Sequence, residues 1–234
     1  MPSTRIHPPP AGWPYAPRKG KANLLTHVNQ TVPRMGGGWT LRLVPGVTLD
    51  GAANPLMDAF GRGGVFRIGE AVIRPYRRGG MVRHVNRSTY VGIHRFESEF
   101  EAHARLFAMG FPTVQPMGYG FRRRGLGWQG LFITRWVEST PWPNTWCHSP
   151  EFLVALGAAV KALEAAECWA PDLNATNVLT TPEGGLLLLD WDRASFGQGP
   201  GLMPRYRARM SRSLQKLHAP ADVILRLMKC LSDP

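Results

Sequence analysis

The chain has 234 residues, of which 44% are hydrophobic and 19% charged, a composition typical of folded proteins and unlike that of disordered chains. Its 28 Lys and Arg residues outnumber the 16 Asp and Glu residues and give a net charge of +12, which favours contact with phosphates, anionic lipid or nucleic acid. Because the sequence shows no recognisable nucleic-acid-binding module, no nucleic-acid partner is expected.

The N-terminal part of the chain predicts an arm followed by a small antiparallel sheet. Residues 1–38 are rich in Pro, Gly, Lys and Arg, which predicts a loose or partly ordered arm that contributes little core. Short apolar stretches over residues 40–44, 64–68 and 71–73 are separated by glycines, a pattern typical of short strands. Gly69-Glu70 is the expected hairpin tip.

The middle of the chain predicts one amphipathic helix and two further strands. Apolar residues recur at helical spacing over residues 96–109, and Gly110 and Pro112 supply stop signals. Residues 113–117 and 131–137 then have the pattern of strands. An exposed basic turn is expected to separate them at Arg122, Arg123 and Arg124.

The C-terminal part of the chain predicts a more helical region. A loop is expected over residues 141–150, followed by an apolar helix over residues 151–167. A basic helix over residues 205–217 and a further helix over residues 219–231 end the chain.

Two polar motifs flank a predicted hairpin in this region. Strands over residues 178–180 and 186–189 are joined by a turn that contains Pro and Gly. Asn177 precedes the first strand and Asp190 follows the second, so pairing of the strands brings both residues to the same end of the ribbon. Asp172 can approach from the preceding loop.

Such a cluster suits phosphoryl transfer. The reaction needs an acidic group that accepts or orients the proton of a hydroxyl, and it needs metal-bound phosphates held in line with that hydroxyl. Mg²⁺ takes one or two carboxylates, keeps several waters and completes its shell with phosphate oxygens, so Asn177 and Asp190 are candidate ligands. The alternative is that Asp172 and Asn174 only form turn hydrogen bonds.

The order of these motifs resembles the catalytic and metal-binding loops of the protein-kinase superfamily. Trp191-Asp192 stands where protein kinases have Phe-Gly, which points away from protein substrates. More narrowly, the chain resembles the bacterial 3-deoxy-D-manno-octulosonic acid (Kdo) kinases, and then the lipopolysaccharide-core heptose kinases. The motifs that carry this resemblance are Tyr76-Arg77-Arg78-Gly79-Gly80, Gly110-Phe111-Pro112, Asp172-Leu173-Asn174 and Asp190-Trp191-Asp192-Arg193.

The resemblance implies an α+β, two-lobed, protein-kinase-like fold that binds ATP between its lobes. Residues 39–140 are assigned to an N-lobe with a small antiparallel sheet and one helix, and residues 141–234 to a short, mostly helical C-lobe. It further implies that Asp172 is the catalytic base and that Asn177 and Asp190 bind Mg²⁺.

The resemblance also assigns the nucleotide-binding residues. Arg74 stands where most kinases have a Lys that contacts phosphates, and Glu99 is its expected partner, with neighbouring helix carboxylates as alternatives. Gly61, Gly63 and Gly64 are candidates for covering the phosphates with backbone N–H groups.

The expected acceptor, by the same resemblance, is the 4-hydroxyl of Kdo on a lipid A precursor. Ala170 replaces the His that the family has two positions before the catalytic Asp, and with Arg74 it keeps two alternatives open. One is another small-molecule kinase, acting on heptose or an aminoglycoside, and the other is a pseudokinase that binds anionic lipid or a protein. Candidate substrate residues are Arg77, Arg78, Asn174, Asp192 and Arg193, and for the last two a structural ion pair is an equal interpretation.

The expected location is cytoplasmic and peripheral on the inner membrane. Three scattered cysteines indicate neither a disulfide framework nor a zinc site, which favours a reducing compartment. The longest apolar runs are far shorter than the ~20 residues of a membrane span. Arg77, Arg78, Arg205, Arg207, Arg209 and Arg212 are expected to form either an ordinary solvated face or a membrane-facing basic surface. Trp142 and Trp146 are expected to pack against the fold.

Overall fold

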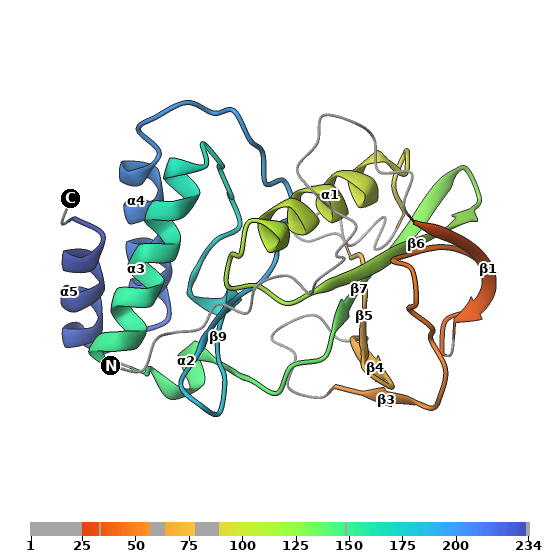
Figure 1. Cartoon of the computed structure of the whole chain (residues 1–234), viewed down its shortest axis with the longest axis horizontal. Coiled ribbons are helices and arrows are strands. Elements are labelled where there is room, and N and C mark those ends of the chain that lie inside the picture. Colours follow the sequence, from red (N-terminus) through yellow and green to blue (C-terminus); the bar gives the residue numbers. More distant parts are fainter. Residues whose placement is uncertain (1–24, 33, 57–63, 78–88, 148, 233–234) are drawn as a thin grey trace. The chain divides into compact units, whose positions relative to one another are not determined.

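The computed structural model describes residues 25–32, 34–56, 64–77, 89–147 and 149–232. These divide into two compact units (Figure 1). The sheet unit comprises the described residues of 10–108 and 115–136, and the helical unit comprises residues 109–114 and the described residues of 137–234. The assignment of 39–140 and 141–234 as functional lobes stays a prediction.

The sheet unit is built on an antiparallel sheet in which seven strands are described, in the order β1-β2-β6-β7-β5-β4-β3 (Figure 1). In β4 and β5, Ile68 pairs with Ala71, so Gly69 and Glu70 form the two-residue turn that the sequence predicts. Gly69 has a φ of 53°, a left-handed conformation that glycine adopts without steric cost. The strands are β1 Thr26–Val32, β2 Gly36–Leu43, β3 Ala53–Pro55, β4 Phe66–Ile68, β5 Ala71–Pro75, β6 Pro116–Arg124 and β7 Gly127–Arg135.

Two sequence predictions in this unit are wrong. We expected little core from residues 1–38, yet residues 26–32 and 36–38 belong to β1 and β2, and the Val32 side chain is fully buried; residues 1–24 lie outside the described part of the chain. The expected basic turn at Arg122, Arg123 and Arg124 is the end of β6, and the chain reverses at Gly125 and Leu126. Arg122 is held in the strand because its guanidinium donates to the Met35 carbonyl and the Gln129 side chain.

Successive side chains of a strand point to opposite faces of the sheet, and both faces of this sheet carry buried apolar residues. On β7, Leu131 and Ile133 belong to a core cluster on one face, whereas Phe132 belongs to a cluster on the other. Helix α1 (His94–Ala108) packs on the Phe132 face, where Phe96, Phe100 and Ala104 are buried, as their helical spacing predicts (Figure 1). The sheet thereby fixes the register of α1.

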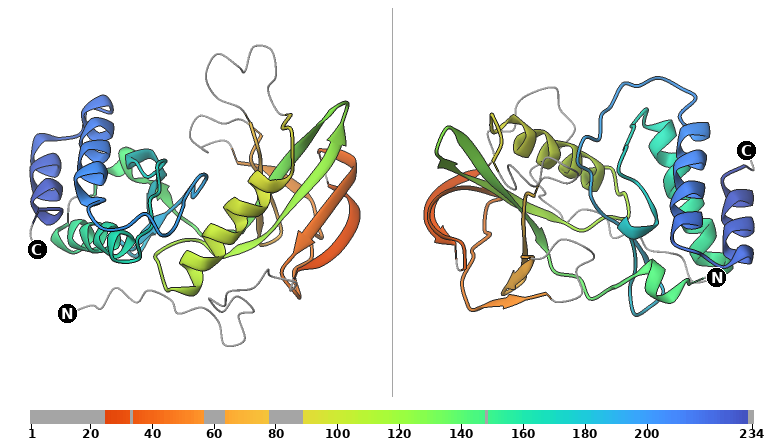
Figure 2. Two further views of the ribbon diagram at one scale, coloured as in Figure 1. Left: turned by 90° about the horizontal axis from the view of Figure 1, so that it is seen from above. Right: turned by 180° about the vertical axis from the view of Figure 1, so that it is seen from behind.

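The helical unit contains three packed helices and a small antiparallel sheet. Helices α3 (Pro150–Ala165), α4 (Met203–Lys216) and α5 (Ala221–Cys230) lie side by side (Figure 2). Strands β8 (Thr140–Pro141), β9 (Val178–Thr180) and β10 (Leu186–Leu188) form the sheet in the order β10-β9-β8. The predicted hairpin is therefore present, with Val178 paired to Leu188.

The segment predicted as a loop over residues 141–150 is instead partly regular. It contains the end of β8 and the short helix α2 (Trp142–Thr145), which the buried Trp142 holds in place. The Trp142 indole donates to the Cys147 carbonyl at 2.9 Å, and its ring contacts Trp146 and Phe152. The expected packing of these tryptophans against the fold is confirmed.

The close approach of β7 to α1 generates a stability prediction. A Cβ at Gly130 would overlap the Phe96 ring of α1, so Gly130→Ala is expected to destabilise the protein by about 1–3 kcal/mol, as overpacking does. A Cβ at Gly92 would meet no atom within 4 Å, so Gly92→Ala is the matched control, expected within about 0.5 kcal/mol of the native protein. Urea unfolding followed by circular dichroism measures both; equal midpoints would contradict the packing described here.

Candidate active site

Asp172 lies in the loop between α3 and β9, and its backbone carbonyl accepts two side-chain hydrogen bonds. The Asn174 side-chain amide donates to this carbonyl at 2.7 Å and the Asn177 amide donates to it at 2.8 Å. Asn174 also caps the short 3₁₀ helix η2 (Ala175–Asn177), because its Oδ1 accepts from the Thr176 N–H at 2.9 Å. The same asparagine side chains thus stabilise the turn of residues 174–177 and fix the position of Asp172.

The hairpin places Asn177 and Asp190 at one end of the β9–β10 ribbon. The Leu189 N–H donates to the Asn177 carbonyl at 2.8 Å, directly beyond the pair Val178–Leu188. Asp190 follows with a φ of 64°, an uncommon conformation for a residue other than glycine but one that Asp tolerates better than most. The structure therefore brings Asp172, Asn177 and Asp190 together as the sequence predicts.

The Asp172 carboxylate is held by two arginines. Arg193 approaches it as a fork, with Nη2 2.9 Å from both carboxylate oxygens and Nε 3.2 Å from Oδ2. Arg209 adds a longer contact of 3.4 Å from Nη2 to Oδ1. A fork of this kind fixes both the position and the plane of a carboxylate. The ion pair considered for Arg193 is therefore present, and its partner is the candidate base.

One face of α4 holds the backbone of the loop that carries Asp172. The Tyr206 hydroxyl donates to the Cys168 carbonyl at 2.6 Å and accepts from the Ala170 N–H at 3.0 Å. Arg209 Nε donates to the Leu173 carbonyl at 3.0 Å, and Ser213 Oγ accepts from the Ala175 N–H at 3.1 Å. Residues three and seven positions after Tyr206 lie on the same helix face, so α4 presents a continuous row to the loop.

Burial keeps the first member of this row neutral. Desolvation raises the pKa of Tyr206 well above the usual value of about 10, so the hydroxyl stays protonated and can donate a hydrogen bond at every physiological pH.

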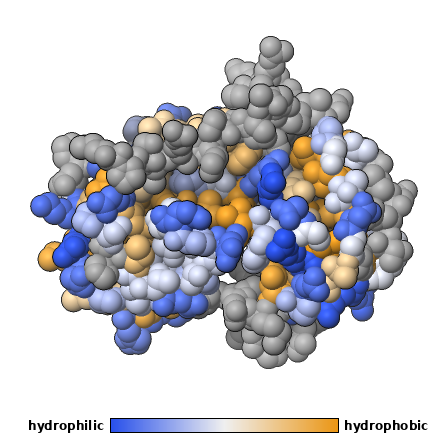
Figure 3. All heavy atoms as spheres, turned by 60° about the horizontal axis from the view of Figure 1, so that its bottom comes forward, coloured by the Kyte–Doolittle hydropathy of each residue, from blue (hydrophilic) through white to orange (hydrophobic). Residues whose placement is uncertain are grey.

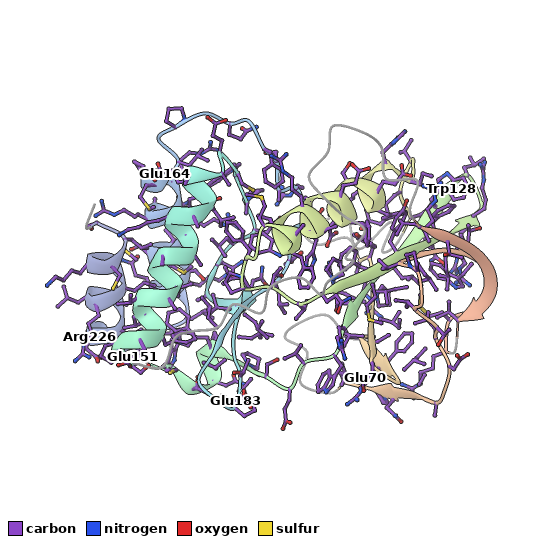
Figure 4. The ribbon with its side chains drawn as sticks, viewed as in Figure 1. Glu70, Trp128, Glu151, Glu164, Glu183 and Arg226 are labelled. Atoms are coloured by element: carbon purple, nitrogen blue, oxygen red, sulfur yellow. The ribbon has the colours of Figure 1, made fainter. Side chains whose placement is uncertain are left out.

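Helix α3 supports the start of α4, because the Glu164 side chain accepts a hydrogen bond from the Met203 N–H at 3.1 Å (Glu164 is labelled in Figure 4).

Trp191 has a structural role behind the hairpin. Its indole N–H donates to the Thr113 hydroxyl at 2.9 Å, and that hydroxyl donates to the Leu188 carbonyl at 2.7 Å. The Leu188 N–H donates to the Pro112 carbonyl at 2.7 Å. Hydrogen bonds through Thr113 and Leu188 thus connect Trp191 to the Gly110-Phe111-Pro112 motif.

In the sheet unit, the expected pair of Arg74 and Glu99 is present. Arg74 Nη2 donates to Glu99 Oε1, and the Glu99 side chain is only 1% exposed. The Arg74 guanidinium also lies 5.5 Å from the Tyr76 ring centre and 5.6 Å from that of Phe132. A buried carboxylate and two aromatic rings therefore fix the direction of this arginine.

The remaining predicted residues are only partly described. Gly64 is exposed with a φ of 102°, and a Cβ there would lie 2.5 Å from Arg77 Nη2. Asp192 is half-buried directly before Arg193. Gly61, Gly63 and Arg78 lie outside the described residues, so their assignments stay predictions.

Sequence reasoning missed Tyr206, Ser213 and Thr113, and it assigned Arg209 to a solvated or membrane-facing surface. The signal for the α4 row was the polar spacing 206, 209 and 213 beside the buried positions Met210 and Leu214. That spacing becomes informative only once the helix is known to face the loop.

Comparison with known proteins gives a consistent result. The model of the lipopolysaccharide kinase (Kdo/WaaP) family matches residues 56–218. A 3-deoxy-D-manno-octulosonic acid kinase of Xylella fastidiosa (strain M12) is 31% identical over 185 residues, which cover 73% of each chain. The enzyme of the same name from Xanthomonas campestris pv. campestris (strain B100) is 30% identical over 185 residues, covering 69% of this chain and 70% of its own.

The α4 row generates a prediction about loop order. Ser213→Ala removes the acceptor of the Ala175 N–H, so we expect faster amide exchange over residues 168–177 and a loss of stability of about 1 kcal/mol. Ser211→Ala is the matched control, because two residues correspond to roughly half a helical turn and place Ser211 away from this row. Hydrogen exchange read by mass spectrometry distinguishes them; identical exchange in the two variants would contradict the role of α4.

Proposed function

Because the chain belongs to the lipopolysaccharide kinase (Kdo/WaaP) family and is a phosphotransferase, we propose that it transfers the γ-phosphate of ATP to the 4-hydroxyl of Kdo on a lipid A precursor. The observation that carries the proposal is the grouping of Asp172, Asn177 and Asp190 around one end of the β9–β10 hairpin. The relatives named as Kdo kinases support the acceptor.

Asp172 acts as the base in this proposal. The acceptor oxygen forms a bond to the γ-phosphorus, the bond from that phosphorus to the bridging oxygen of ADP breaks, and the hydroxyl proton passes to Asp172. Because phosphoryl transfer depends mainly on positioning and charge stabilisation, the fixed carbonyl and the forked arginine are useful features of this residue.

The residues at the hairpin end fit a magnesium ion. Among the described residues, no three His, Cys, Asp or Glu side chains group as a metal cage. Mg²⁺ does not require one, since it uses one or two carboxylates with water and substrate phosphate. Asn177 uses Nδ2 to hold the Asp172 carbonyl, so Oδ1 is its atom suited to a cation, and Asp190 supplies a carboxylate. When bound, the ion would neutralise charge on the ATP phosphates.

Arg74 binds the ATP phosphates in this proposal, and Glu99 orients it. An arginine keeps its charge at every physiological pH and presents a planar fork, so it can replace the usual lysine in attracting a phosphate. Removing Arg74 would leave Glu99 as a buried carboxylate, which is costly.

Arg193 is the described residue best suited to an acidic acceptor. Its side chain is 63% exposed while its guanidinium holds Asp172, and Kdo carries a carboxylate that a guanidinium can bind bidentately. We further propose Arg77, Arg78 and Asp192 as acceptor contacts. Asn174 is better assigned to loop position, because both ends of its amide contact the loop itself.

The proposed location is the cytoplasmic face of the inner membrane, where a peripheral enzyme would meet a lipid-linked acceptor. Within the residues that the structure describes, no helix combines the length and apolar character of a membrane span. The basic surface expected from the net charge of +12 supports attraction to anionic lipid.

Phosphate transfer from radiolabelled ATP to a panel of acceptors tests the proposal. We expect transfer to Kdo-lipid A, and little to heptose or an aminoglycoside. Asp172→Asn is expected to lower kcat by about 10²–10⁴-fold, because the amide cannot accept the proton. Asp222→Asn on α5 is the matched control and should leave kcat unchanged.

Each alternative gives its own result in this assay. Transfer to heptose or an aminoglycoside alone would replace the Kdo assignment with another small-molecule kinase. A folded protein that shows no turnover with any acceptor, yet binds anionic lipid equally well as Asp172→Asn, would favour the pseudokinase.

A further inference from the structure

The end of the β6–β7 hairpin presents an apolar residue that the fold does not use. Leu126, between Gly125 and Gly127, has a side chain that is 98% exposed. A second aliphatic residue, Val91, is 95% exposed. Buried leucine and valine side chains stabilise a fold, whereas fully exposed ones give it nothing, so two such residues together mark a candidate contact surface.

The two exposed residues belong to segments that pair with each other. The Tyr90 N–H donates to the Trp128 carbonyl at 2.7 Å, and the Trp128 N–H donates to the Tyr90 carbonyl at 2.8 Å. This isolated bridge places Val91 and Leu126 on neighbouring chain segments, with Val91 next to Tyr90 and Leu126 two residues before Trp128. Figure 4 shows Trp128 near the end of the hairpin. We name this surface, made of residues 90–91 and 123–128, the hairpin patch.

Basic side chains surround the hairpin patch. Residues 122–128 contain three arginines and no acidic residue, and Arg123 and Arg124 are exposed. The Arg123 guanidinium lies 5.4 Å from the Trp128 ring centre, and that of Arg95 lies 5.0 Å from the Tyr90 ring centre. The Tyr90 ring is buried in the core, whereas Trp128 is partly exposed. Exposed aliphatic side chains, a partly exposed tryptophan and flanking arginines are a combination that contacts the headgroup region of an anionic bilayer.

The other basic surface expected from the sequence is partly used inside its own unit. On α4, Arg205 stacks on the Trp169 ring at 3.9 Å, and Arg209 contacts the loop that carries Asp172. Strongly hydrophilic residues are also spread over the face shown in Figure 3, so hydrophilic character alone does not identify a docking surface. The hairpin patch differs because it adds exposed apolar side chains to the charge.

We propose that the hairpin patch is the surface by which this chain binds an anionic lipid bilayer, with Leu126 entering the interface and the arginines contacting lipid phosphates. The inference deepens the proposed function, because it gives an enzyme with a lipid-linked acceptor a docking point. It does not depend on the identity of the acceptor, since lipid binding can be measured without ATP or Kdo.

Vesicle sedimentation tests the proposal with the full chain. The probes are vesicles of phosphatidylcholine alone and vesicles containing about one third phosphatidylglycerol, compared at low and high salt. We expect the native chain to bind the anionic vesicles only, and less at high salt. Leu126→Asp is expected to weaken this binding by about tenfold or more, because it removes the apolar contact and adds a repelled charge.

Matched variants separate the hairpin patch from other exposed surfaces. Leu225 on α5 is 73% exposed, so Leu225→Asp makes the same change elsewhere and is expected to bind within about twofold of the native chain. Replacing Arg123 and Arg124 by Gln is expected to weaken binding and flatten its salt dependence, whereas the same change at Arg207 and Arg212 of α4 is expected to have a smaller effect.

Several outcomes would overturn the proposal. The native chain could fail to bind either kind of vesicle. Leu126→Asp and Leu225→Asp could weaken binding to anionic vesicles equally, or only the α4 variant could weaken it. A dimer dissolved by Leu126→Asp, with no vesicle binding, would assign the patch to a protein partner instead. Transfer to water-soluble Kdo reports separately on the proposed function, and Leu126→Asp should leave it unchanged.

Discussion

The candidate site depends on the contact between α4 and the loop of residues 168–175. Three side chains of one helix face, Tyr206, Arg209 and Ser213, hydrogen-bond to the loop backbone. Such bonds matter because unpaired backbone groups are costly once buried, so the helix and the loop order each other. The Ala170 N–H, two residues before Asp172, donates to the Tyr206 hydroxyl of α4.

The two units use a common physical device. In each, a charged side chain that the proposal needs is oriented by opposite charge: Asp172 by Arg193 and Arg209, and Arg74 by Glu99. Isolated surface ion pairs contribute little stability, but a forked contact or a buried partner fixes direction. These pairs are therefore better understood as positioning devices than as sources of stability.

Local pattern predicted much of the fold, and distant contacts account for part of what it missed. The period of Phe96 and Phe100, the Gly69 turn and the strands around Asn177 and Asp190 are local signals, and all are present. The register of α1 also placed Glu99 against Arg74. Strand β1 and the start of β2, which pair with each other as a local hairpin, were missed because their polar residues and glycines hide the strand pattern. The α4 row was missed because its hydrogen bonds join residues more than thirty positions apart.

We propose that this member of the lipopolysaccharide kinase family phosphorylates Kdo at its 4-hydroxyl. Phosphorus–proton correlation NMR of the product formed by the native chain from ATP and Kdo-lipid A tests it most directly, because it identifies the carbon that bears the new phosphate. We expect the phosphorus to couple to the proton at position 4 of Kdo. A phosphate at another position, or an unmodified acceptor after incubation with folded protein, would contradict it.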